Sequence, residues 1–350
     1  MKNWIAIAAA TVAAMSWQAA TVGEAAAQQP VRWQMASSYP GSLVTLGTGG
    51  KRLQDQINKV SGGNIQIRFN EPGALVPALE VFNSVSQGSV DAGWGATGIY
   101  TGRDISFALF SAVPFGPDHN EFMAWMHASG QKLSDEIFGS FNVKVLGCGM
   151  LSPEASGWFR NPITSLDQLK GLRMRFFGLG ARVMAKLGVT TTNQPAGELM
   201  QALQLGTIDA TEFGPPAIDV GMGFHQVAKN LYFPGWHQPA SYFHIFFPKA
   251  KWDGLNDTQR AQIESVCSDN IRFTIAEGEA LQFNAMQELL KRGVTFHTWT
   301  PEVIAAFKRG WEEVAAEESA RSANFKKVWD DLQAFRVGYK VWSDRGYYRQ

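Results

Sequence analysis

The sequence predicts an α/β protein built from two lobes of similar design. Strand and helix patterns alternate along the chain, and one segment occurs twice in related form. The length of 350 residues is enough for about two domains. With 45% hydrophobic and 18% charged residues, the chain can also bury a large core.

The balance of positive and negative charges limits the kinds of molecule that the protein is expected to bind. The chain carries 31 Lys and Arg residues and 31 Asp and Glu residues, so its formal net charge is zero. Nucleic acids are bound by basic surfaces that neutralise their phosphates, so we expect no nucleic-acid partner. A small anion fits this balance, because one well-placed Arg can bind it.

The first 27 residues have the pattern of a secretory signal peptide. Lys2 precedes a short apolar run over 4–20, and Ala residues at 25–27 provide the small side chains needed for cleavage. A membrane anchor is the alternative, but a spanning helix needs about 20 strongly apolar residues. We therefore expect an exported mature chain that begins near Gln28.

The first elements follow one another as strand, helix and strand. Residues 31–36 alternate between polar and apolar side chains like a strand, and a helical pattern then ends at the Ser-Gly-Gly of 61–63. Residues 65–69 alternate again. This order predicts βαβ units and mostly parallel pairing.

The repeated segment occupies residues 77–92 and 195–210, which read PALEVFNSVSQGSVDA and PAGELMQALQLGTIDA. Each copy predicts a helix that begins after Pro and leads into a short buried strand. Gly88 and Gly206 are expected to end these helices, because Gly readily adopts the left-handed conformation of a helix C-cap. The offset between the copies is too long for a solenoid and fits one copy in each lobe.

The loops after the two repeat strands are candidate ligand-binding loops. They comprise residues 93–98 and 211–216, and each contains Gly and an aromatic residue. Ligands bind α/β sheets at the carboxyl ends of the strands, so we expect the loops to face one another across a cleft. Ordinary turns with a core aromatic are the alternative.

Cys148 and Cys267 are the only cysteines. Export permits a disulfide, but two cysteines in a chain of this length do not form a disulfide framework. Cys148 lies in an apolar predicted strand and Cys267 in a predicted helix. We therefore expect two separate buried thiols.

Common catalytic motifs are absent from the sequence, including HExxH, Walker, CxxC and Gly-x-Ser-x-Gly patterns. Residues 178–183 begin like a dinucleotide fingerprint, but Val183 stands where close packing needs Gly or Ala. The six histidines are scattered. His237 and His244 lie near a cleft segment, and structural roles are favoured for both. We therefore expect a binding protein without a cofactor rather than an enzyme.

Six short segments carry a resemblance to a known family. They are 62–63 with the strand that follows, 71–75, 87–91, 169–175, 206–210 and 232–236. In this order and spacing, from Trp33 to about Trp342, the chain resembles the solute receptors of tripartite ATP-independent periplasmic (TRAP) transporters. The resemblance implies a two-lobed periplasmic binding protein of the Venus-flytrap type, with mixed sheets and long C-terminal helices.

The resemblance also implies a division of the chain. Lobe I is expected at 28–150 plus about 239–270, and lobe II at 151–238, with hinges near Leu151 and Gln238. Helical patterns over 255–290 and 301–334 place a helical region at about 271–350. It either packs across both lobes or forms the interface of a homodimer, as in related receptors.

The resemblance assigns the ligand carboxylate to Arg175, the second Arg of the strand that follows Lys-Gly-Leu. A planar guanidinium can bind both oxygens of a carboxylate in a bidentate pair. Arg173 lies on the same face of the strand, so alternation alone leaves both residues open. A structural role for Arg175 is the alternative.

The resemblance is greatest to the branch whose receptors bind a 2-oxo acid together with a metal ion. That branch has Gln, Glu-Trp and Glu where this chain has Glu154, Glu212-Phe213 and Gln238. These four residues are therefore the expected metal ligands. Their oxygen atoms suit a hard cation such as Na⁺ or Ca²⁺. The alternative is that the carboxylates accept hydrogen bonds from the ligand or from backbone amides.

The implied ligand is a 2-oxo or 2-hydroxy monocarboxylate, whose carboxylate and C2 oxygens could chelate the cation. Glu154, Phe213 and Gln238 are then expected beside the acid as well, and Trp94, Tyr100, Phe177 and Phe213 are candidate walls, although core packing explains aromatics equally well. The implied function is periplasmic capture of the acid and its delivery to integral-membrane subunits. An exported enzyme with Glu154 and Glu212 as acid and base, or a receptor for a sensor kinase, are the alternatives.

Overall fold

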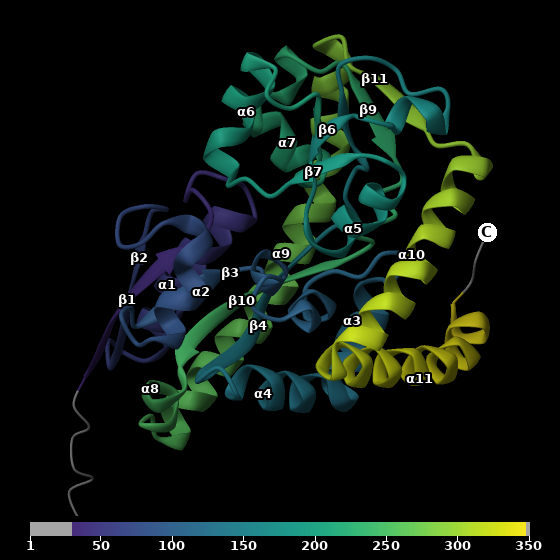
Figure 1. Cartoon of the computed structure of the whole chain (residues 1–350). Coiled ribbons are helices and arrows are strands. Elements are labelled where there is room, and N and C mark those ends of the chain that lie inside the picture. The colour runs from purple at the N-terminus through teal and green to yellow at the C-terminus, as the bar shows by residue number, and fades with distance from the viewer. Residues whose placement is uncertain (1–29, 348–350) are drawn as a thin grey trace, which may run out of the picture.

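Two mixed β-sheets organise the protein, as seen in the computed structural model, which describes residues 30–347 (Figure 1). The signal peptide expected at 1–27 lies outside the described residues. Each sheet with its helices forms one of two bodies that lie side by side in Figure 1. The predicted two-lobed α/β fold is therefore confirmed.

The first sheet has the strand order β2-β1-β3-β10-β4. Strands β1, β2 and β3 are parallel, whereas β10 is antiparallel to β3 and β4. The strands are β1 (Val31–Ser37), β2 (Ile65–Asn70), β3 (Ala92–Gly95), β4 (Val143–Leu151) and β10 (Ser241–Pro248). Its helices and turns are α1 (Leu46–Val60), η1 (Ala78–Glu80), α2 (Val81–Ser86), η2 (Thr97–Tyr100), η3 (Ile105–Phe110), α3 (His119–Trp125), η4 (Met126–Gly130), α4 (Gln131–Gly139) and α8 (Lys249–Asp253).

The second sheet has the order β11-β9-β5-β8-β6-β7 and is also mixed. Its strands are β5 (Gly157–Phe159), β6 (Arg173–Arg175), β7 (Thr190–Thr192), β8 (Ala210–Thr211), β9 (Asn230–Phe233) and β11 (Thr295–Thr298). Its helices and turns are η5 (Leu166–Leu169), α5 (Gly178–Lys186), α6 (Ala196–Leu205), α7 (Pro216–Met222) and η6 (Phe224–Gln226). Strand β11 corrects the expectation that the region after 271 is purely helical, because it extends this sheet beside β9.

The internal repeat corresponds to equivalent elements in the two sheets. The first copy forms η1, α2 and β3, and the second forms α6 and β8. Gly88 and Gly206 follow the helices with φ of 73° and 68°, the left-handed region in which Gly carries no Cβ penalty. The predicted helix and glycine stop are therefore confirmed in both copies. The short buried strand begins only at the last residue of each copy, so residues 93–95, expected in a loop, belong to β3 instead.

Three connections join the sheets. Residues 152–156 lead from β4 to β5, and residues 234–240 lead back from β9 to β10. The third is the long helix α9 (Asp257–Lys291), which contacts α1 and β4 on the first sheet and α7 on the second before the chain enters β11. Asn256 caps α9, because its side chain accepts a hydrogen bond from the backbone N–H of Gln259.

The C-terminal helices α10 (Pro301–Arg321) and α11 (Ala323–Gly346) cover one side of the molecule (Figure 1). Helix α10 contacts α5 of the second sheet, and α11 contacts α3 and η3 of the first. The break between them falls at Ser322, whose hydroxyl caps α11 by accepting from the N–H of Phe325 at 3.1 Å. These helices therefore contact both bodies.

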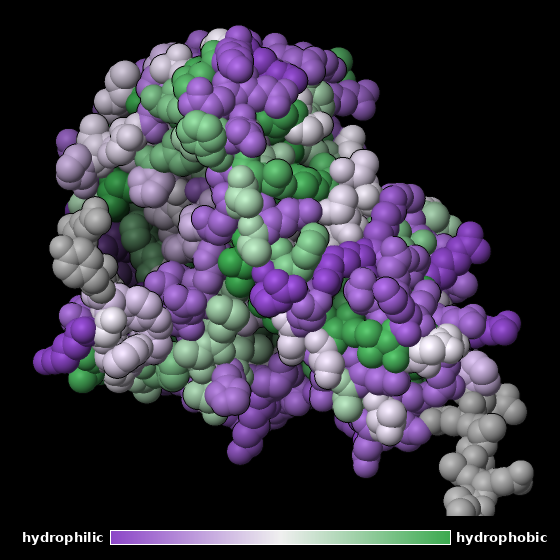
Figure 2. Space-filling view, turned by 180° about the vertical axis from the view of Figure 1, so that it is seen from behind, coloured by the Kyte–Doolittle hydropathy of each residue, from purple (hydrophilic) through white to green (hydrophobic). Residues whose placement is uncertain are grey.

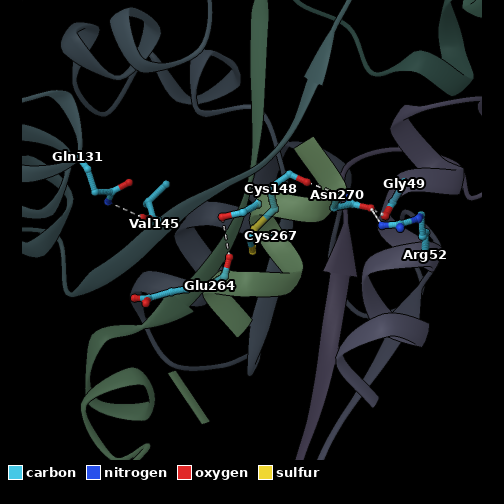
Figure 3. Close-up of a disulfide and its surroundings, with 9 residues drawn as sticks. Gly49, Arg52, Gln131, Val145, Cys148, Glu264, Cys267 and Asn270 are labelled. Atoms are coloured by element: carbon cyan, nitrogen blue, oxygen red, sulfur yellow. Dashed lines mark hydrogen bonds between the residues drawn. A yellow bond between two sulfur atoms is a disulfide. The ribbon is translucent and has the colours of Figure 1, made fainter. Parts of the chain in front are cut away.

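Cys148 and Cys267 form a disulfide between β4 and α9 (Figure 3). The expectation of two separate thiols is wrong, because α9 returns across 119 residues of sequence to pack on β4. Asn270 strengthens the same junction by donating to the carbonyl oxygens of Cys148 at 2.7 Å and Gly49 at 3.3 Å. Helix α9 is thus fastened to the first sheet covalently and through buried hydrogen bonds.

The face opposite to that of Figure 1 carries a mixture of hydrophilic and hydrophobic side chains (Figure 2). Several large apolar side chains of α11 are exposed: Val337 by 73%, Val341 by 62% and Trp342 by 60%. Within the described part of the chain, no helix combines the length and apolar character needed to cross a bilayer.

Candidate functional site

A small cavity lies between the sheets, beside the two short connections that join them. Its volume is about 40 Å³, and a single water needs at least about 10–15 Å³ by the same measure, so only a small molecule fits without movement of the walls. The residues around it are Tyr39, Leu46, Ala96, Ile99, Ser111, Leu151, Glu154, Arg175, Phe177, Phe213, Gln238, Ser241, Tyr242 and Phe243.

Arg175 is the buried cation of this cavity. It ends β6 and is 6% exposed, and its Nη1 donates to the backbone carbonyl and to Oε1 of Glu212, both at 2.8 Å. Its guanidinium lies 5.3 Å from the centre of the Phe213 ring. The Nε atom is buried and has no hydrogen-bond partner among the described residues.

Arg173 differs from Arg175 although it lies two residues away on the same strand. Its side chain is half exposed and bonds Asp209, with Nε to Oδ2 at 2.9 Å and Nη2 to Oδ1 at 2.6 Å. Of the two arginines, Arg175 lines the cavity and Arg173 does not. Arg175 stands at the carboxyl end of β6, whereas Arg173 stands at the amino end of that strand.

Glu212 is a fully buried carboxylate directly after β8. Its Oε1 accepts from Arg175 and from the backbone N–H of Phe177 at 2.6 Å, while Oε2 has no hydrogen-bond partner among the described residues. Burial is the largest single influence and would raise the pKa of Glu212, but Arg175, His237 and the backbone N–H of Phe177 together outweigh it, so the pKa is lowered. Glu212 is therefore ionised at neutral pH with one oxygen unsatisfied.

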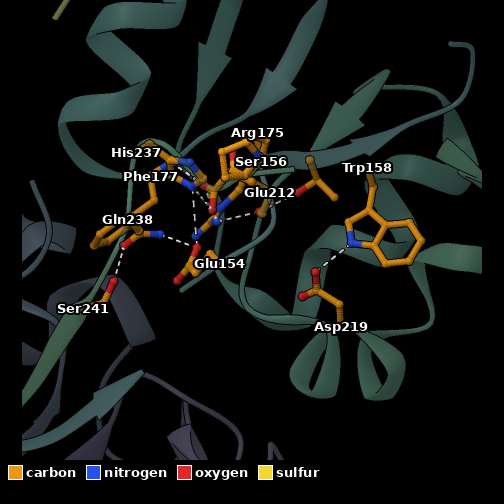
Figure 4. A network of polar contacts seen from close by, with 12 residues as sticks. Glu154, Ser156, Trp158, Arg175, Phe177, Glu212, Asp219, His237, Gln238 and Ser241 are labelled. Carbon is orange, nitrogen blue, oxygen red and sulfur yellow. Dashed lines mark hydrogen bonds and ion pairs between the residues drawn. The ribbon is translucent and has the colours of Figure 1, made fainter. Parts of the chain in front are cut away.

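Glu154 and Gln238 come from the two short connections and hold them together (Figure 4). The Gln238 Nε2 donates to Glu154 Oε2 at 2.5 Å, and the backbone N–H of Glu154 donates to the Gln238 carbonyl at 3.3 Å. Ser241 fixes the orientation of the amide, because its hydroxyl donates to Gln238 Oε1 at 2.9 Å. Burial raises the pKa of Glu154 to about 7.

His237, for which the sequence favours a structural role, lies next to the two carboxylates of the site. The ring is buried between the two carboxylates, with Nε2 3.6 Å from Oε2 of Glu154 and 3.6 Å from Oε2 of Glu212. Burial opposes its protonation, but the carboxylates outweigh burial and raise the pKa of His237 to about 9. Its position directly before Gln238 in the connection was the only signal in the sequence.

The structure brings five of the expected site residues together at the cavity and places two aromatic candidates elsewhere. Those brought together are Glu154, Arg175, Glu212, Phe213 and Gln238, and Phe177 lines the cavity beside them. Trp94 does not line it, because it is fully buried behind Leu46, to whose carbonyl its Nε1 donates at 2.7 Å. Tyr100 also lies away from the cavity, with its hydroxyl 3.0 Å from that of Ser38. The role of wall assigned to these two aromatics is therefore wrong.

The polar groups could bind an anion and a cation side by side. Arg175 offers an unsatisfied donor to an acid. Ligand atoms of Glu154, Glu212 and His237 all lie within 4.8 Å of one another, a spacing suited to one metal ion. Carboxylate and amide oxygens are typical ligands of hard cations, and imidazole nitrogen is a ligand of transition metals. A metal role for Phe213, expected from the sequence, stays a prediction.

Comparison with known proteins places this arrangement among solute receptors. Residues 36–321 match the family described as bacterial extracellular solute-binding protein, family 7. The monocarboxylate 2-oxoacid-binding periplasmic protein all3028 of Nostoc sp. is 30% identical over 343 residues, which cover 97% of this chain and 94% of that protein.

Solved structures agree in fold over nearly the whole chain. A TRAP transporter solute-binding protein from Bordetella bronchiseptica, with copurified calcium and picolinate in its active site, has a TM-score of 0.88 and 28% identity, and the match covers 91% of this chain and 96% of that one. A TRAP periplasmic solute-binding protein from Colwellia psychrerythraea with bound calcium and pyruvate has a TM-score of 0.85 and 26% identity, with 91% and 98% covered.

Proposed function

We propose that this chain, which belongs to family 7 of the bacterial extracellular solute-binding proteins, captures a small 2-oxo or 2-hydroxy monocarboxylate together with a cation. The family is extracytoplasmic, and the protein is a periplasmic solute receptor of the TRAP type. The observation that carries the proposal is Arg175, buried with an unsatisfied donor next to two carboxylates at a small cavity between the sheets.

The acid is oriented by the two charged groups of the site. Its carboxylate binds the guanidinium of Arg175, where a charge-assisted hydrogen bond replaces water. Its C2 oxygen points toward Glu154 and Glu212, where a cation joins the ligand to the protein. The apolar end faces Leu46 and Phe243, which line the cavity. A cavity of about 40 Å³ favours acids close to pyruvate in size.

The cation compensates an excess of negative charge. In the cation-bound state, with both carboxylates ionised, His237 neutral and one guanidinium present, the protein part of the site carries one net negative charge, and the bound acid adds a second. A cation between Glu154 and Glu212 would satisfy Glu212 Oε2, which has no hydrogen-bond partner in the described chain. Gln238 and the backbone at Phe213 complete the set of ligands that we propose. Binding of calcium or sodium with pyruvate in related receptors supports this arrangement.

The mechanism is capture by closure without a chemical step. We propose that lobe I comprises 28–150 with about 239–270, that lobe II comprises 151–238, and that they rotate about hinges near Leu151 and Gln238. The two sheets and the short connections between them support this division. A ligand that contacts both lobes binds the closed state better than the open one and so shifts the population toward closure. The closed surface is then recognised by the integral-membrane subunits of the transporter.

A homodimer is a further part of the proposal. The apolar side chains of Val337 and Val341 stand one helical turn apart on α11 and are exposed, as is Trp342. A patch of this kind supports association through the C-terminal helix. Sedimentation of the mature chain tests it, and a monomer at micromolar concentration contradicts it.

The rival function is an exported enzyme that uses Glu154 and Glu212 as acid and base. The different pKa directions of the two carboxyl groups suit such a pair. A receptor for a sensor kinase is the other rival, and neighbouring genes for integral-membrane transporter subunits would favour transport.

The decisive experiment is a calorimetric screen of 2-oxo and 2-hydroxy acids with and without added Ca²⁺ or Na⁺. We expect stoichiometric binding of a small acid that is strengthened by a cation, and recovery of the acid unchanged after incubation. Conversion of the acid would favour the enzyme. The absence of binding by every acid, with either cation, would refute the proposed function.

A further inference from the structure

The proposed function leaves the imidazole of His237 unexplained, although the ring lies between the two carboxylates of the site. The ring is completely buried, and neither nitrogen has a hydrogen-bond partner within residues 30–347. A buried polar group without a partner costs free energy, so its retention needs a reason. Its Nε2 points at two carboxylates that come from different elements.

Two of the three distances among these groups match the spacing of ligands around one small ion. Nε2 lies 3.6 Å from an oxygen of Glu154 and 3.6 Å from an oxygen of Glu212. Zinc binds nitrogen and carboxylate oxygen at about 2.0–2.2 Å, so two tetrahedral ligands of one ion lie roughly 3.4 Å apart. The distance also exceeds that of a hydrogen bond, which leaves room for an ion between the groups.

The surrounding packing holds the ring in place. The ring of Phe176 lies edge-on to the imidazole at 4.7 Å, and that of Trp236 at 5.6 Å. The absence of a side chain at Gly180 matters here, because a Cβ at that position would lie 2.9 Å from the Cβ of His237. The imidazole is therefore oriented before an ion arrives, as a metal ligand needs to be.

We propose that His237 is a nitrogen ligand of the cation site and that, with Glu154 and Glu212, it makes this receptor prefer a divalent transition ion such as Zn²⁺ over Ca²⁺ or Na⁺. This inference rests on the proposed function of the same site and adds the identity of the ion. Imidazole nitrogen suits Zn²⁺ and neighbouring transition ions, whereas Ca²⁺ and Na⁺ select oxygen. A divalent ion also balances the charge of two carboxylates, one guanidinium and one bound acid.

The test compares ions on tag-free mature protein that has been stripped with a chelator. Zn²⁺, Mn²⁺, Ca²⁺ and Na⁺ are titrated by calorimetry, each with and without pyruvate, and bound metal is measured after dialysis by inductively coupled plasma analysis. We expect one Zn²⁺ per chain, bound at least tenfold more tightly than Ca²⁺. In His237→Gln, Zn²⁺ binding should weaken at least tenfold and Ca²⁺ binding less than threefold. His127→Gln, at an exposed position, should change neither.

A spectroscopic measurement keeps the inference testable if the variant folds poorly. The visible bands of Co²⁺ bound to the unaltered protein should have the intensity of a low-coordinate site with a nitrogen ligand. Preference for Ca²⁺ or Na⁺, or a Zn²⁺ affinity unchanged in folded His237→Gln, overturns the inference. So does the absence of any bound metal, which would mean that a protonated His237 bridges the carboxylates instead. If acid binding still depends on Arg175 after any of these outcomes, the proposed function remains supported although the inference about the ion fails.

Discussion

Replacement of Arg175 by Ala perturbs the site most severely, and its cost follows from the contacts of this side chain. The guanidinium is 7% exposed and is paired with Glu212, whose side chain is completely buried. Truncation of one partner of a buried, hydrogen-bonded charge pair costs about 2–5 kcal/mol, and in the complex it is the carboxylate of the bound acid that would lose its charged partner. At about 1.4 kcal/mol for each factor of ten, the affinity for the acid should fall roughly 30-fold to a few thousandfold.

Isothermal titration calorimetry with pyruvate in the presence of saturating cation measures this loss directly. Arg173→Ala is the matched control, because Arg173 lies on the same strand but is half exposed and bonds Asp209 outside the cavity. Its removal should change the affinity less than threefold. Circular dichroism must show that both variants are folded. Unchanged affinity in folded Arg175→Ala, or equal losses in the two variants, would refute the assignment.

Three further predictions concern the cation, the disulfide and pH. Glu212→Gln should weaken Ca²⁺ binding at least tenfold in calorimetry, because a carboxylate ligand is lost, and an unchanged value would remove Glu212 from the cation site. The double substitution Cys148→Ser with Cys267→Ser should lower the free energy of unfolding by about 2–5 kcal/mol in urea titrations, and a loss below 1 kcal/mol would contradict the role given to this link. In the folded, metal-free chain the pKa of His237 is raised from 6.5 to about 9. The stabilisation that protonation of His237 gives to the fold is therefore complete below pH 6.5 and is lost as the pH rises through 9. The unfolding midpoint of metal-free protein should fall across this window, and a fall of the same size in His237→Gln would exclude His237 as its source.

The fold could be predicted largely from local patterns. The repeat at 77–92 and 195–210 indicated two similar lobes, because its Pro, Gly and apolar positions encode the same helix, stop and strand in each copy. The placement of β11 beside β9 was not predictable in this way. Its four residues form a strand because they pair with β9 at the edge of the second sheet. The chain reaches that edge only after α9 has crossed from the first sheet to the second.

The site was predictable where charge and resemblance pointed to the same residue. Arg175, Glu154 and Glu212 were singled out in this way, and the structure places them together. His237 and the disulfide were missed for a shared reason. Both depend on contacts between segments distant in sequence, and no local spacing distinguishes a ligand histidine or a paired cysteine from a buried structural one.

The prediction for Trp94 was wrong in the opposite way, because it assigned a buried core residue to the ligand site. An aromatic residue in a loop after a repeat strand suggested a wall of the ligand site, but the short strand β3 turns this ring into the core of the first lobe. There it packs edge-on against Phe243 at 5.1 Å, and Phe243 is the residue that reaches the cavity. Alternation along a strand of four residues is too short to decide which aromatic is exposed to a ligand.

A crystal structure of the mature protein grown with pyruvate and a divalent cation tests the central claim most directly. The account predicts the carboxylate of pyruvate within hydrogen-bond distance of the Arg175 guanidinium, and an anomalous peak for the cation between Glu154 and Glu212. Pyruvate bound away from Arg175, or a cavity that holds only water at saturating pyruvate, would contradict it.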